Sequence, residues 1–148
     1  MATVDLDAIK AEWIGVTFDE ITFQVDAERI VNWAIATGEE DPRFIDPNHP
    51  DFQAHPAFAT HFGARRWVPE GFPQFGNGNG IDGGKSIEMH AAIHSGDVLT
   101  ATSKIADIYD KTGRSGTMVF IVHRLEFVNQ DGVHVATVDT RQIRSMGN

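Results

Sequence analysis

Cysteine is absent from the 148-residue sequence, so neither disulfide bonds nor thiolate chemistry is available to the protein. Basic side chains are also few: 12 lysines and arginines stand against 21 aspartates and glutamates, and the formal net charge is −9. Because a protein that binds nucleic acid neutralises phosphates with a basic face, this balance argues against a nucleic-acid partner. A few local lysine and arginine side chains would still suffice to bind a phosphorylated small molecule.

Long hydrophobic runs are missing too. No stretch approaches the roughly eighteen apolar residues of a membrane helix, and the N-terminus lacks the basic-then-apolar layout of a signal peptide. Hydrophobic residues nevertheless make up 41% of the chain, enough to bury a core. We therefore expect one cytoplasmic domain over residues 1–148, with residues 1–18 as an N-terminal extension and no membrane segment.

The clearest helix signal begins at Asp26, whose carboxylate can accept the free amides of a first helical turn. Gly38 follows where a left-handed C-terminal cap belongs. The residues between them that would share one face are spaced as in a helix: Ile30, Trp33, Ala34 and Thr37. Residues 5–13 predict a second, short helix, and the alternation in residues 21–25 predicts a half-buried strand.

Residues 39–84 hold all six prolines and the glycine-rich run 76–80, which predicts irregular structure with a short helix near residues 57–65. Long irregular segments in compact domains often line binding sites. This one is too apolar for a solvated linker, since its aromatic residues include Phe58, Phe62, Trp67, Phe72 and Phe75. We expect part of it to pack against the core, a partner or a ligand.

The remaining residues predict strands over 85–93, 98–109, 117–128 and 133–143, separated by turns rich in glycine. The last turn ends in Asp131-Gly132, a strong hairpin signal. Three long strands joined by tight turns form an antiparallel meander, and with the preceding helix they predict an α+β fold in which the sheet wraps around the helix. An up-and-down barrel is the alternative, but it leaves the amphipathic helix and the proline-rich segment without a role.

Four segments, in this order, resemble the N-terminal half-domain of MaoC-like dehydratases. They are residues 30–42, residues 54–58 (Ala-His-Pro-Ala-Phe, where the family has Ala-Pro-Pro-Thr-Phe), residues 83–99, and residues 127–132 with the strand that follows. The resemblance implies a hot-dog fold, an antiparallel sheet wrapped around a helix. It also implies that two such domains pair as a homodimer or heterodimer and bind an acyl thioester of coenzyme A or acyl carrier protein between them. The implied reaction is reversible addition of water across a 2-enoyl thioester, with the coenzyme A thioester as substrate and no further cofactor.

That reaction needs a base to activate water and an acid to protonate the alpha carbon. Catalytic family members supply an aspartate and a histidine from a Gly-Asp-x-Asn-Pro-x-His stretch, and the matching residues here are 38–44. Glu39 falls at the aspartate position and Phe44 at the histidine position. Because phenylalanine cannot transfer a proton, we predict the half of a dehydratase that lacks the usual Asp/His pair and whose catalytic half lies on another chain.

Two other functions fit the same residues. The first is an autonomous hydratase with altered chemistry, in which Glu39 or Asp41 acts with a histidine such as His55, the residue that replaces a proline of the family stretch. The second is a non-enzymatic module that binds acyl thioesters. A metal site is not expected, because His49, His55 and His61 recur every six residues, which matches neither helical nor zinc-site spacing.

The candidate substrate-binding residues are mostly aromatic. Lys85 closely follows the glycine-rich run and is a candidate for a phosphate of coenzyme A, as are Arg65, Arg66 and Arg114. The run itself lacks the Gly-Lys-Ser/Thr ending of a P-loop, so we interpret it as a surface loop. With Lys85, the candidates for the acyl tunnel are Phe44, Phe58, His61, Trp67 and Phe75. Core or interface packing is an equally good interpretation of the aromatic residues.

Overall fold

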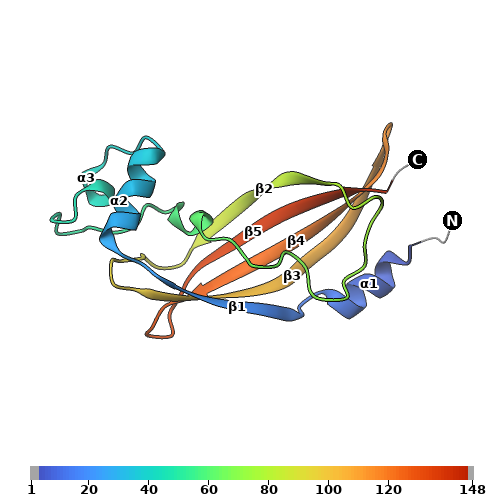
Figure 1. The fold of residues 1–148 in the computed structure, drawn as a ribbon, viewed down its shortest axis with the longest axis horizontal. Helices are drawn as coiled ribbons and strands as arrows, with labels where there is room; N and C mark the ends of the chain where they lie inside the picture. The colour runs from blue at the N-terminus through green and yellow to red at the C-terminus, as the bar shows by residue number, and fades with distance from the viewer. Residues whose placement is uncertain (1–3, 147–148) are drawn as a thin grey trace.

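The computed structural model describes residues 4–146, which form one five-stranded antiparallel sheet in the order β1-β3-β4-β5-β2 (Figure 1). The strands are β1 (Thr17–Gln24), β2 (Gly80–Met89), β3 (Val98–Gly113), β4 (Gly116–Val128) and β5 (His134–Ser145). The helices are α1 (Leu6–Trp13), α2 (Ala27–Ala36), α3 (Pro42–Ile45) and the 3-10 helix η1 (Phe58–His61). The strands run along the length of the molecule, with α2 and α3 at one end of the sheet and α1 near the other (Figure 1).

The predicted meander is confirmed, because β3 pairs with β4 and β4 with β5, both antiparallel. In the hairpin that joins β3 and β4, both strands are longer than predicted, because residues 111–116 were expected to form the turn. Pairing continues to Gly113 opposite Gly116, and the hydroxyl groups of Thr112 and Thr117 lie 2.8 Å apart across the strands. The turn is therefore only two residues, and Gly116 provides the positive φ of 101° that closes it.

Strand β2 begins five residues before its predicted start. Residues 80–84 were expected to be irregular, but Gly80, Ile81 and Asp82 pair with β5, and the register shifts between Asp82 and Lys85. Gly83 and Gly84 are the unpaired residues of this shift, and Gly84 has a φ of +93°. The prediction was wrong here because a glycine pair that signals a loop also builds a β-bulge inside a strand.

Helix α2 is capped as predicted. The Asp26 carboxylate accepts a hydrogen bond from the backbone amide of Arg29 at 2.7 Å, and Gly38 turns the chain with a φ of +83°. Ile30 and Ala34 are fully buried. The predicted helix near residues 57–65 is only the four-residue η1, because the backbone becomes extended at Phe62, whose ring packs against Phe23 with centroids 4.4 Å apart. No helix among residues 4–146 is long and apolar enough to cross a membrane.

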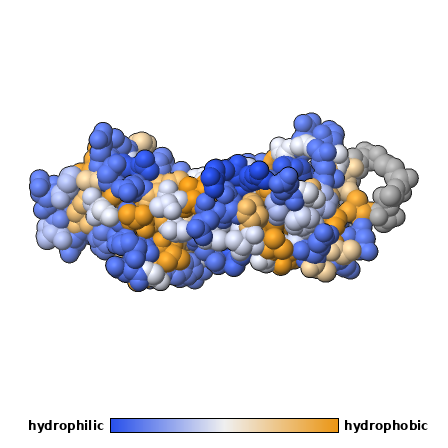
Figure 2. Space-filling model, turned by 60° about the horizontal axis from the view of Figure 1, so that its bottom comes forward, coloured by the Kyte–Doolittle hydropathy of each residue, from blue (hydrophilic) through white to orange (hydrophobic). Residues whose placement is uncertain are grey.

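One face of the sheet carries two hydrophobic clusters. The first lies beneath α2 and η1 and includes Ile30, Phe58 and Phe127, while the second lies beneath α1 and the segment 68–75. On the face in Figure 2, hydrophobic residues accordingly gather toward the two ends of the molecule, with hydrophilic residues between them. Helix α2 thus covers only one end of the sheet, and α1 together with the segment that connects η1 to β2 covers the other.

Candidate active site

Glu39 lies in the turn that leads from α2 to α3, and its carboxylate holds that turn together. Its Oε1 atom accepts hydrogen bonds from the backbone amides of Glu40 and Asp41, both at 2.9 Å. Its Oε2 atom lies 3.3 Å from Nε2 of His55, and about a quarter of the Glu39 side chain is exposed. The structure therefore brings together two of the three predicted catalytic residues.

Each ring nitrogen of His55 has a polar neighbour. Nδ1 accepts a hydrogen bond from the backbone amide of Ala57 at 3.0 Å, so the proton of the neutral ring is on Nε2, which faces Glu39. The ring is flanked by the side chains of Trp33 and Phe44, with centroids 5.5 and 5.1 Å away. The imidazole is thus held in a fixed tautomer and orientation between two aromatic rings.

Asp41, the third predicted catalytic residue, does not contact His55. It caps α3 through the backbone amide of Arg43 at 3.0 Å, and it pairs with the Arg43 guanidinium at 2.7 Å. This hydrogen bond from Arg43 lowers the pKa of the Asp41 carboxyl. Asp41 is therefore a capping residue that is paired with Arg43 and takes no part in the Glu39–His55 contact.

Phe44, at the position of the family histidine, is 7% exposed. One side of its ring meets His55, and the Arg43 guanidinium lies 5.1 Å from its centroid. The position that would carry a proton in a catalytic family member therefore carries a packing residue. The imidazole that contacts Phe44 belongs to His55, eleven residues further along the chain.

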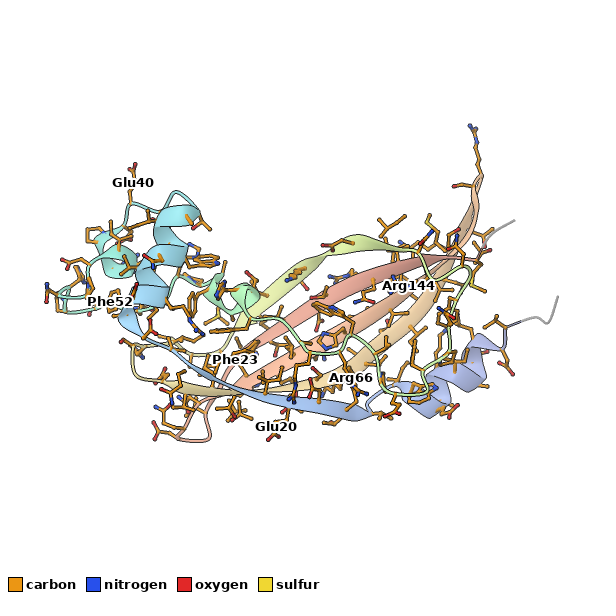
Figure 3. The ribbon with its side chains drawn as sticks, in the orientation of Figure 1. Glu20, Phe23, Glu40, Phe52, Arg66 and Arg144 are labelled. Atoms are coloured by element: carbon orange, nitrogen blue, oxygen red, sulfur yellow. The ribbon has the colours of Figure 1, made fainter. Side chains whose placement is uncertain are left out.

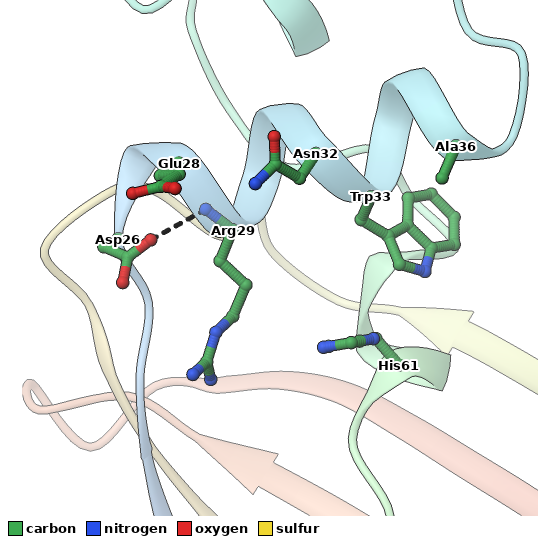
Figure 4. Close-up of a pocket in the computed structure, with 7 residues that line it drawn as sticks. All are labelled: Asp26, Glu28, Arg29, Asn32, Trp33, Ala36 and His61. Atoms are coloured by element: carbon green, nitrogen blue, oxygen red, sulfur yellow. Dashed lines mark hydrogen bonds between the residues drawn. The ribbon is translucent and has the colours of Figure 1, made fainter.

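A pocket of about 490 Å³ runs along the neighbouring face of α2 (Figure 4). Arg29 and Trp33 of α2 line this pocket together with His61 of η1, and the predicted contact of His61 with a substrate stays a prediction. Trp33 connects the pocket to the Glu39–His55 pair, since it lines the pocket and also packs on His55. Sequence reasoning assigned Trp33 only to the helix face. The pocket is lined by Asp26, Glu28, Arg29, Asn32, Trp33, Ala36 and His61.

The other predicted substrate-binding residues lie elsewhere. Phe58 is fully buried in the first hydrophobic cluster and Phe75 is 2% exposed in the second. Trp67 and Lys85 line a separate cavity of about 370 Å³ that is bounded by residues of β2 and β5. The structure thus divides the predicted acyl-tunnel residues between one pocket, one cavity and the core, and their contact with a substrate stays a prediction.

Replacing Glu39 by alanine is expected to destabilise the protein by about 1–2 kcal/mol, because two backbone amides and one imidazole lose their acceptor. Glutamine at this position keeps an acceptor oxygen and should cost less. The free energy of unfolding in urea measures both effects. Glu40→Ala is the matched control, since that side chain is exposed and should cost under about 0.5 kcal/mol. Equal losses at positions 39 and 40 would contradict the described contacts.

Solved structures with a similar fold include dehydratases, hydratases and two complexes. A MaoC-like dehydratase from Rhodospirillum rubrum is 18% identical, with a TM-score of 0.64 over 90% of this chain and 93% of that chain. The HadBC (3R-hydroxyacyl-ACP dehydratase) complex from Mycobacterium tuberculosis is also 18% identical, with a TM-score of 0.65 over 91% and 99%. The ChsH1–ChsH2 complex from the same organism is 17% identical, with a TM-score of 0.68 over 97% and 90%.

These similarities define the class of protein: the fold is the hot-dog fold of the MaoC-like dehydratases, as the sequence predicted. No curated protein matches the chain in sequence. The family described as "FAS1-like, dehydratase domain region" matches residues 12–138, and this chain belongs to that family.

Proposed function

We propose that this chain is a subunit of an enoyl-thioester hydratase or 3-hydroxyacyl-thioester dehydratase, and that it depends on a partner subunit for the Asp/His pair. The observation that carries the proposal is the packing at Phe44. A buried aromatic ring stands at the position of the proton carrier, and it is closed in by His55 and Arg43. The family to which the chain belongs supplies the reaction class.

The contacts of Glu39 and His55 support dependence on a partner. A general base must reach the proton that it removes, within hydrogen-bond distance or through one water. Glu39 and His55 instead bind each other and the backbone of their own loops, and neither lines the pocket beside α2. The contact between Glu39 and His55 therefore holds two loops together, and His55 in turn holds the Trp33 ring beside the pocket.

The sheet leaves two places for a partner subunit, because β1 and β2 are its edge strands and each has one unpaired side. The HadBC and ChsH1–ChsH2 neighbours are complexes. In the proposed assembly this chain contributes its sheet and the pocket along α2, and the partner contributes the catalytic residues. The substrate is an acyl thioester of coenzyme A or of acyl carrier protein.

The test is to measure hydration of crotonyl-CoA by the chain alone and with a MaoC-like partner that carries Gly-Asp-x-Asn-Pro-x-His. The mixture is expected to be at least tenfold more active than either subunit, since a barrier lowered by about 1.4 kcal/mol already gives that factor. Changing the partner's motif aspartate to asparagine should remove the activity and leave the complex intact. A mixture no more active than the partner alone would refute the proposed role.

The 3.3 Å contact between Glu39 and His55 favours a second candidate, an autonomous enzyme that uses this pair. It predicts turnover by the pure chain, lost in a variant that combines Glu39→Gln with His55→Asn. The leading proposal predicts no turnover by the pure chain, and a partner-dependent activity that survives those two substitutions in a folded complex. The same assay therefore separates the two candidates.

A further inference from the structure

The cavity that is lined by β2, β5 and Trp67 lies away from the Glu39–His55 pair. Figure 3 places Arg144, which lines it, at the end of the sheet remote from Glu40 in the turn after α2. The cavity has a volume of about 370 Å³, and neither proposed function assigns it a role. Its lining residues are Trp67, Gly80, Ile81, Asp82, Lys85, Thr140, Arg141, Gln142 and Arg144.

The β-bulge in β2 aims two charged side chains at this cavity. Asp82 pairs with Gln142 and Lys85 pairs with Thr140, and alternate residues of a strand share a face. In a regular strand, residues three apart such as Asp82 and Lys85 would point to opposite faces of the sheet, but here Gly83 and Gly84 stand opposite one residue of β5, so the strand holds one extra residue. The bulge therefore places both of them on the face that already carries Thr140, Gln142 and Arg144.

Arg144 is partly buried and has no carboxylate within ion-pair distance among residues 4–146. Its guanidinium donates to Oε1 of Gln142 at 3.1 Å and to the carbonyl of Ile143 at 3.4 Å. It also lies across Gly80, where an added methyl group would collide with Nη1. A partly buried cation is stabilised by a counter-charge, and in this cavity a bound anion would provide it.

Lys85 also has no carboxylate within ion-pair distance in the described part of the chain, and its Nζ atom only reaches the carbonyl of Thr60, at 3.4 Å. Arg141 lines the same cavity and is a third such cation, since its guanidinium donates to Oγ of Ser86 at 3.4 Å. Of the twelve lysines and arginines of the chain, six have no carboxylate partner among residues 4–146, and three of these six line this one cavity.

The remaining lining residues indicate more than a simple anion. Trp67 offers a flat aromatic surface, one side of which is fixed by the buried ring of His123 at a centroid distance of 5.0 Å. The Asp82 carboxylate accepts from the amide of Gly84 through Oδ1, and within residues 4–146 its Oδ2 atom has no donor. A carboxylate beside these cations suits a ligand with both phosphate oxygens and hydroxyl or amino donors.

We propose that this cavity binds the phosphorylated part of a nucleotide, with Arg144 and Lys85 on the phosphates, Asp82 on a hydroxyl or amino group and Trp67 against the base. The ligand is either a free nucleotide or the nucleotide end of a coenzyme A thioester. A free nucleotide would be a ligand beyond the proposed hydratase function, whereas binding of the coenzyme A thioester rests on that function, because the thioester is its substrate.

Titration calorimetry of the whole chain with ADP tests the site. ADP is expected to bind, and Arg144→Gln or Lys85→Gln should each weaken binding about tenfold or more, as loss of one charge-assisted hydrogen bond does. Gly80→Ala should weaken it as well, because the methyl group displaces the flexible guanidinium without disturbing a strand backbone. Arg114→Gln, in the exposed turn between β3 and β4, removes the same charge and should leave the affinity unchanged.

Binding of coenzyme A at least as tightly as ADP, with no binding of unphosphorylated pantetheine, would identify the thioester carrier as the source of the nucleotide. ADP binding tighter than that of coenzyme A would identify a free nucleotide. The proposal is overturned if ADP does not bind at millimolar concentration, or if Arg144→Gln and Gly80→Ala, both confirmed as folded by circular dichroism, bind it like the parent. A chain that binds ADP but never raises crotonyl-CoA hydration would retain this site and lose only the hydratase role.

Discussion

Truncation of Phe58 to alanine is expected to reduce the free energy of unfolding by about 3–5 kcal/mol. The side chain is fully buried, and its ring meets those of Trp33, His61 and Phe62 at centroid distances of 6.0, 5.9 and 5.3 Å. These contacts join η1 to α2 and to the sheet, so the cavity that alanine leaves lies where three elements meet. Urea unfolding followed by circular dichroism measures the loss.

Two comparisons make the Phe58 result specific. Phe58→Leu should cost much less, because most of the buried volume is retained. Phe120→Ala removes an identical ring from the outer face, where it stacks on Tyr109 at 4.8 Å and is partly exposed, and should cost about 1 kcal/mol. A loss at Phe58 no larger than the loss at Phe120 would mean that Phe58 faces a ligand space and not the core.

Acidification is expected to destabilise the fold through His123. This side chain is fully buried on β4, and neither ring nitrogen has a hydrogen-bond partner among residues 4–146. Burial lowers its pKa to about 4, against the opposing influence of the Asp139 and Asp19 carboxylates. The ordinary pKa of 6.5 applies to the unfolded chain, which therefore binds more protons than the folded one between pH 6.5 and 4.

Because the unfolded chain binds more protons in this range, lowering the pH favours unfolding. The contribution of His123 is constant above pH 6.5 and is lost as the pH falls through the window to 4, by about 3 kcal/mol in total. Urea unfolding at pH 7.5 and at pH 4 measures the change. The carboxylates of the chain also titrate at low pH, so the informative quantity is the difference between the parent and His123→Leu. If both proteins lose equal stability over this range, the buried neutral imidazole is disproved.

The sequence was sufficient for the elements with strong local signals. The Asp26 cap, the helical spacing after it and Gly38 located α2, and the Asp131-Gly132 turn located the last hairpin. Where one residue type serves two structures, prediction failed: Gly83 and Gly84 favoured a loop but form the bulge of β2. The alternation along β4 would have placed His123 on the buried face, and this signal was missed.

The candidate site was predictable only in part. Alignment with the family stretch located Glu39 and Phe44, because each has a fixed place after the helix. That His55 meets both of them depends on the path of a proline-rich segment, which no periodicity specifies. The cavity that is bounded by residues of β2 and β5 could not be predicted either. Lys85 and Arg144 are about sixty residues apart in the sequence, and only the register of the two strands brings them together.

The bulge at Gly83 and Gly84 also bears on aggregation. β2 is an edge strand, and a long, regular edge is a template on which other chains can add strands to build fibrils. The bulge interrupts the regular spacing of amides and carbonyls, so that only Lys85–Met89 offers a continuous row. Another chain could therefore add a strand along only half of β2. The two glycines thus shorten the part of β2 on which another chain could add a strand.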